Sequence, residues 1–227
     1  MWKELFGLAS NNNLFVQAHE QAVEMLDIDW TMYKASIESL RNSDTGDISI
    51  DISAKDKEVN KGERDVRRKI LTHLSITGGG NLSAGLALAT IVIDIERIGD
   101  YTKNIHDLSI NHPKRLNAGK LEDKLQEVEK GITELFENMI KSYKHDDVEL
   151  ARKVMLDYKQ ELSSACDEIT DAIVGGKTDD LSPQEAAAVA LYARFLKRIA
   201  SHSRNIISAV VNPFPRIGYK EKKDAEE

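Results

Sequence analysis

Glu96, Asp100 and Asn104 are spaced four residues apart in a stretch rich in apolar residues. In a helix this spacing places the two carboxylates and the amide on one face. Carboxylates one turn apart repel each other by about 0.2–0.5 kcal/mol unless a positive charge lies between them. The neighbouring Arg97 should point about 100° away around the helix. A hard cation, which takes several oxygen ligands, is therefore one chemistry that this pattern favours.

An upstream stretch offers a matching set of oxygen atoms. Asp56, Asn60 and Glu63 are spaced i, i+4 and i+7, so they also share one helical face. If the two faces meet, their carboxylate and amide oxygens surround one place. The alternative is a solvated acidic face that pairs with the basic residues around it: Lys57, Lys61, Arg64 and Arg67. Spacing alone leaves both interpretations open.

Enzymatic motifs are absent from the sequence. A ferritin-like di-iron oxidase uses Glu-x-x-His on its helices, and none of the six histidines follows a Glu at that distance. There is no Walker A loop, dinucleotide fingerprint or nucleophile elbow. The single cysteine, Cys166, excludes an intramolecular disulfide and is expected to be a buried structural thiol. We predict that the protein is not an enzyme.

The acidic phrase occurs twice, 101 positions apart. Residues 96–100 read ERIGD and residues 197–201 read KRIAS, each followed by Asn-Ile at the same distance. The same offset places Asp56 over Asp157. A chain that repeats itself at this interval contains two copies of one supersecondary unit. The second copy has exchanged both acids for Lys197 and Ser201, which should make that region neutral or locally positive.

The apolar periodicity predicts six long helices. Glycines at 78–80 end the second one, Asn111-His112-Pro113 marks the seam between the repeats, and Ser182 should cap the sixth. The expected helical ranges are about 13–43, 48–76 (with an extended entry), 82–109, 120–144, 148–174 and 183–211.

Long helices joined by short turns pack as antiparallel neighbours, so the expected fold is all-α with two three-helix bundles. The first bundle should comprise residues 1–111, with the intact Glu-x-x-x-Asp motif. The second should comprise residues 112–212, with the degenerate motif. Residues 213–227 read as a charged, disordered tail.

Composition narrows the function classes. The 227 residues are 41% hydrophobic and 30% charged, which is typical of a globular helical protein. A net charge of −7 argues against a nucleic-acid surface. No secretory signal is seen, and the longest nearly apolar run, residues 84–93, is too short to cross a bilayer. We expect a cytoplasmic protein.

The first residues form a short amphipathic pattern made by Trp2, Leu5, Phe6 and Leu8. Such a segment either touches a membrane or a partner, or docks on the protein's own bundle. Peripheral membrane contact is therefore one expectation for this chain.

The phrase at 95–100, followed by Asn104-Ile105, closely resembles the signature of the PhoU family of phosphate-signalling regulators. Residues 198–206 are similar to the second family signature with its acids replaced, and residues 56–60 are similar to the acidic stretch of the preceding family helix. The resemblance covers residues 11 to 211, including the tandem repeat.

The resemblance implies a metal site in the first repeat. Glu96 and Asp100 match the family motif, with Asp56 and Asn60 as the neighbouring positions. The expected cofactor is a divalent or trivalent ion such as iron, zinc, manganese or magnesium. Lys197 and Ser201 depart from the motif, so a second site is not expected.

The resemblance also implies a non-enzymatic adaptor between a phosphate ABC transporter and a membrane sensor histidine kinase. Such a protein restrains phosphate uptake and the starvation response when phosphate is plentiful. A homodimer is a further expectation. The alternative function is that of a cytosolic accessory protein of a sodium/phosphate or other ion transporter.

Overall fold

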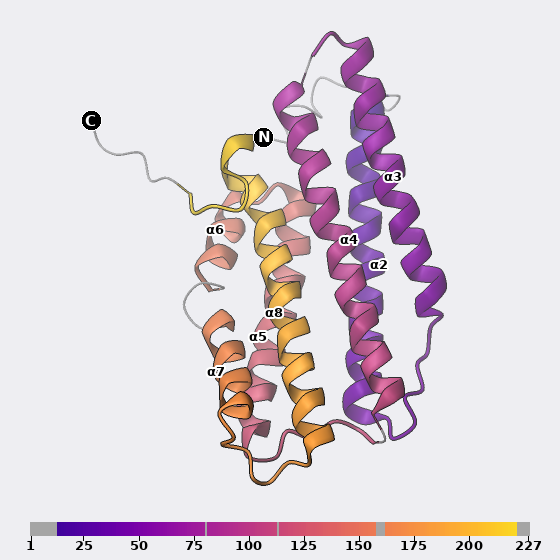
Figure 1. Cartoon of the computed structure of the whole chain (residues 1–227). Coiled ribbons are helices and arrows are strands. Elements are labelled where there is room, and N and C mark those ends of the chain that lie inside the picture. The colour runs from indigo at the N-terminus through magenta and orange to yellow at the C-terminus, as the bar shows by residue number, and fades with distance from the viewer. Residues whose placement is uncertain (1–12, 80, 113, 158–161, 222–227) are drawn as a thin grey trace, which may run out of the picture.

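A computed structural model describes residues 13–79, 81–112, 114–157 and 162–221. This part of the chain is all-α (Figure 1). It contains seven α-helices: α2 (Leu14–Asn42), α3 (Ile52–Ile76), α4 (Leu82–Asn111), α5 (Glu122–His145), α6 (Val148–Asp157), α7 (Ser163–Val174) and α8 (Pro183–Val211). Two short 3-10 turns, η1 (Gly119–Leu121) and η3 (Phe214–Arg216), precede α5 and follow α8.

The helix boundaries follow the capping signals in the sequence. Asp51 accepts a hydrogen bond from the Ala54 amide at the start of α3. Ser182 and Glu185 form a reciprocal capping box at the start of α8, where Pro183 takes the first helical position. The fifth expected helix is described as α6 and α7, and residues 158–161 between them lie outside the described residues.

The helices form two bundles that lie side by side (Figure 1). The first consists of α2, α3 and α4, and the second consists of α5, α6, α7 and α8. Both bundles share one continuous core, because α4 packs along α8 and α2 packs against α5. This confirms the expected all-α tandem arrangement.

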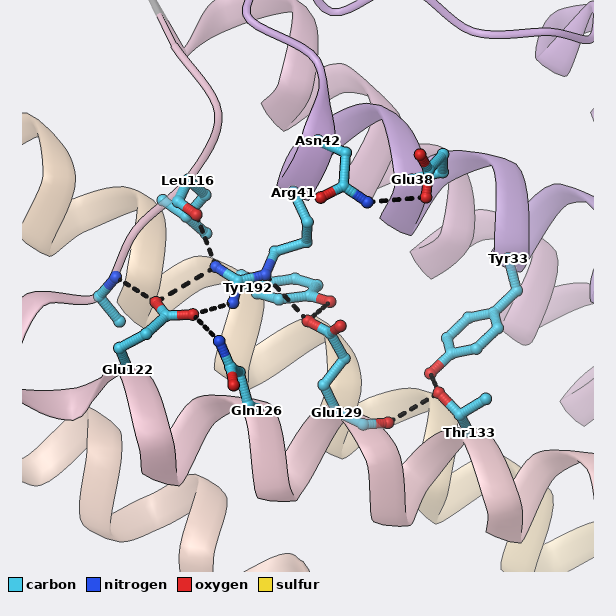
Figure 2. A network of polar contacts seen from close by, with 11 residues as sticks. Tyr33, Glu38, Arg41, Asn42, Leu116, Glu122, Gln126, Glu129, Thr133 and Tyr192 are labelled. Atoms are coloured by element: carbon cyan, nitrogen blue, oxygen red, sulfur yellow. Dashed lines mark hydrogen bonds and ion pairs between the residues drawn. The ribbon is translucent and has the colours of Figure 1, made fainter.

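Arg41 ties the end of α2 to the second bundle (Figure 2). Its guanidinium side chain, only 10% exposed, forms ion pairs with Glu122 and Glu129 of α5 and donates to the Leu116 carbonyl. The Tyr192 hydroxyl of α8 donates to Glu129 over 2.7 Å. Three helices from two repeats therefore meet in one partly buried polar network.

The chain continues to make ordered contacts after α8. The Asn212 amide donates to the Tyr219 carbonyl, and the Glu221 carboxylate pairs with Arg152 of α6. Part of the segment expected to be a disordered tail is therefore held against the second bundle, and residues 222–227 lie outside the described residues. Among the described helices, none is both long and apolar enough to cross a membrane.

Candidate functional site

The two predicted acidic faces meet in the first bundle. Glu96 and Asp100 lie on α4, and Asp56 and Asn60 lie on the adjacent helix α3. Lys103 of α4 reaches across the contact, with its Nζ 3.3 Å from Asp56 Oδ2. The helices that carry these side chains therefore pack against each other, and their role as a cation site stays a prediction.

Asp29 of α2 is a further acid at this place, and the sequence reasoning missed it. It is completely buried, and within the described part of the chain neither carboxylate oxygen has a hydrogen-bond partner. A Cβ atom on Gly99 of α4 would lie only 2.8 Å from Oδ1 of Asp29. The sequence does contain a signal for this buried acid. Asp29 lies at helical spacing between Met25 and Met32, on the face of α2 that is buried.

The acids at this place influence one another electrostatically. Burial raises the pKa of Asp29 well above its usual range, and Glu96, Asp56 and Asp100 raise it further. Burial also raises the pKa of Glu96, and the adjacent Asp100 adds to the effect. We call Asp29, Asp56, Glu96 and Asp100 the acidic cluster. Its physical property is an excess of negative charge in a partly desolvated place.

Nearby bases compensate part of this charge. The Nη1 atom of Arg97 lies 2.7 Å from Asp100 Oδ2, and its Nε lies 3.5 Å from Glu96 Oε2. The expectation that Arg97 points away from the acids is therefore wrong. Its long side chain reaches along the helix to Asp100, three residues later. Glu63 pairs with Arg67 at 2.9 Å, as the alternative of a paired acidic face anticipates.

The donor set has the chemistry of a hard-cation site. Its ligand atoms are carboxylate oxygens, joined by the Asn60 amide, whose nitrogen donates to the Asp56 carbonyl. Within the described residues, however, no group of three or more His, Cys, Asp or Glu side chains is arranged to hold a metal ion. A cation would have to displace Lys103 from Asp56 and Arg97 from Asp100.

The corresponding place in the second repeat holds an internal cation instead. The Lys197 ammonium of α8 forms an ion pair with Asp167 of α7, and Arg194 Nη1 lies 3.8 Å from the same carboxylate. Asp157, the counterpart of Asp56, is the last residue of α6, and its side chain lies outside the described part. Lys197 is thus neutralised inside the protein, which reduces the local positive charge expected for this region.

His202 joins the two repeats. Its Nδ1 lies 2.7 Å from Asp94 Oδ1 of α4, which also accepts a hydrogen bond from the Asn205 amide. The His202 ring stacks on Tyr101, with 5.7 Å between the centroids, and Arg198 donates to the Tyr101 hydroxyl. The second signature therefore supplies an interhelical contact with the first repeat.

Other groups offer little chemistry. Cys166 is buried, and burial raises the pKa of its thiol to about 12, so it is a structural residue as expected. A surface hollow of about 410 Å³ lies beside the end of α2. Its walls include the acids Glu38 and Asp47 and no basic side chain, so the hollow would repel an anion such as phosphate.

Comparisons of the sequence and of the fold with known proteins both point to the PhoU family. Two copies of the PhoU domain match residues 22–108 and 125–210. The fold is similar to that of PhoU from Pseudomonas aeruginosa, at 16% identity and a TM-score of 0.74, covering 89% of this chain and 97% of that one.

A second similar structure is that of the phosphate transport system regulatory protein PhoU from Streptococcus pneumoniae. It is 16% identical with a TM-score of 0.73, and the match covers 87% of this chain and 93% of that one. No curated protein sequence is similar enough to this chain to be matched.

Proposed function

Because the chain belongs to the PhoU family, we propose that it regulates phosphate uptake and phosphate homeostasis by docking on membrane-associated partners. The observation that carries this proposal is the pair of PhoU domains that together span most of the chain. The family consists of regulators that are not enzymes.

The proposed partners are a phosphate ABC transporter and a sensor histidine kinase at the membrane. The protein would restrain both when phosphate is plentiful. The similar protein from Streptococcus pneumoniae is a phosphate transport system regulatory protein, which supports a transporter as one partner. Long helices also provide the ridges and grooves that suit partner helices.

The proposal includes one cation site in the first repeat. Glu96 and Asp100 would hold the ion, with Asp56 and the Asn60 amide oxygen completing the donor set. Bound there, the ion would neutralise the acidic cluster and stabilise the folded state by mass action. The buried Asp29 supports this part of the proposal, because neither of its carboxyl oxygens has a hydrogen-bond partner in the described residues. Burial and the neighbouring acids raise its pKa, and a cation bound beside it would favour the ionised form instead.

Deletion of the gene tests the function. In phosphate-rich medium, the deletion should raise phosphate uptake and the expression of starvation genes, and a plasmid copy of the wild-type chain should restore both. A plasmid copy that carries Glu96→Gln and Asp100→Asn tests whether regulation needs the cation site as well as docking. Unchanged uptake and unchanged starvation output in the deletion strain would contradict the proposal and favour a transporter accessory protein.

A further inference from the structure

The turn between α3 and α4 forms an end of the molecule that is unusually free of charge. The chain as a whole is 30% charged, yet residues 70–93 contain no Asp, Glu, Lys or Arg. Figure 1 shows this turn at the top of the first bundle, projecting beyond the helices of the second. These uncharged residues therefore lie on a protruding, solvent-facing part of the structure.

This end also exposes large aliphatic side chains. Ile76 is 72% exposed, Leu82 51%, Leu86 37% and Ile93 38%. Leu82, Leu86 and Ile93 share one face of α4, since they are spaced i, i+4 and i+11. We call these four residues the apolar end. Covering these exposed side chains is favourable, and apolar side chains grouped at one end of a molecule mark an interaction surface.

The segment that precedes α2 is attached beside the apolar end. Asn13 has an extended backbone, and its side chain caps α2 by accepting a hydrogen bond from the Phe15 amide at 2.8 Å. The ring of Phe15 lies 5.8 Å from that of His73, which is one turn from the last residue of α3. Residues 1–12 therefore join the described structure at the level of the apolar end.

We propose that residues 1–12 dock on the apolar end, with Trp2, Leu5 and Phe6 covering Leu82 and Leu86. In the sequence, Trp2, Leu5 and Phe6 are spaced i, i+3 and i+4, the spacing that would place them on one side of a helical turn. The exposed stripe from Leu82 to Ile93 extends over about 16 Å, and twelve residues reach farther than this even when partly coiled.

Charge and tethering favour residues 1–12 over a lipid surface or a second copy of the chain as the group that covers the apolar end. The net charge of −7 and the absence of Lys and Arg from residues 70–93 give no attraction to anionic lipid headgroups. A second copy would lose translational and rotational freedom on binding. A short tether instead supplies an effective concentration in the millimolar range. A partner helix that uses the same stripe would first have to displace the segment.

Tryptophan fluorescence tests the docking. The chain has two tryptophans, and Trp30→Phe leaves Trp2 as the only one while retaining an aromatic ring against Tyr33 and Phe136. In this background, Leu82→Gln with Leu86→Gln should shift the Trp2 emission to longer wavelength. The same pair should raise acrylamide quenching about twofold, because the intramolecular contact is lost.

Leu191→Gln is the matched control, because Leu191 is a 47% exposed leucine on α8. It should leave both signals unchanged, and circular dichroism should show equal helix content in all variants. Trp2 that is quenched as readily as in a free peptide of residues 1–12 would overturn the proposal. So would protection that disappears on dilution, which identifies a second copy, or protection that requires anionic vesicles, which identifies a lipid surface.

Discussion

A Cβ atom on Gly99 would lie 2.8 Å from Oδ1 of Asp29, so the glycine of the first signature makes room for a buried carboxylate. The second signature has Ala200 at the corresponding position. The acid that faces α4 and the glycine that admits it are therefore coupled features of the first repeat.

Gly99→Ala should destabilise the protein despite the better helix propensity of alanine. Overpacking costs about 1–3 kcal/mol, and the propensity gain of about 1 kcal/mol offsets only part of it. Denaturant unfolding in chelator measures the loss. In an Asp29→Ala background the loss should be smaller, because the clashing oxygen is gone. The same loss in both backgrounds would show that the added methyl group meets something other than Asp29.

His19 should make the stability depend on pH. Burial lowers the pKa of His19 from 6.5 to about 4, since the ring is packed against Tyr143 with 5.0 Å between the centroids. The unfolded state then binds more protons between pH 6.5 and pH 4. The contribution of His19 to stability is therefore complete above pH 6.5 and is lost as the pH falls toward 4, by about 3 kcal/mol.

The variant His19→Phe keeps the aromatic contact and should flatten this part of the curve. Urea unfolding at pH 7, 5.5 and 4.5 measures the slope. His145→Gln is the control, because His145 is exposed and its substitution should leave the slope as it is. An unaltered slope in His19→Phe would assign the pH dependence to other groups.

Arg41→Met should weaken the junction between the repeats. It removes the only described cation that pairs with the partly buried Glu129, and leaving such a charge uncompensated costs up to about 3–5 kcal/mol. Adding Glu129→Gln should restore part of the stability. Arg115→Met is the comparison, because Arg115 pairs with Asp44 in an exposed place and should cost less than about 1 kcal/mol.

The helices could be predicted from the sequence because their signals are local. Apolar periodicity and the caps at Asp51 and Ser182 depend on neighbouring residues alone. The contacts of Asp29, Lys103 and Asp167 could not be predicted in this way. Each depends on how one helix is rotated against another, and the spacing of residues within one helix does not determine that rotation.

The acidic cluster should bind a single cation per chain. Glu96→Ala with Asp100→Ala should abolish the metal content of purified protein and the increase in melting temperature on adding metal, because both motif carboxylates are lost. Lys197→Ala with Ser201→Ala is the matched control in the second repeat and should change neither measurement. Metal content that is equal in all three proteins would contradict the assignment.

The second repeat offers the converse experiment. Lys197 supplies the positive charge beside Asp167, so exchanging it for an acid leaves carboxylates that repel one another. Lys197→Glu with Ser201→Asp restores the Glu-x-x-x-Asp spacing and adds Asp167 as a third oxygen donor from α7. In chelator this variant should melt at a lower temperature than the wild type. Added metal should reverse the loss, and the ions bound per chain should rise from one to two. If the loss persists in metal, Lys197 is a structural ion-pair partner and not the replacement for a bound ion.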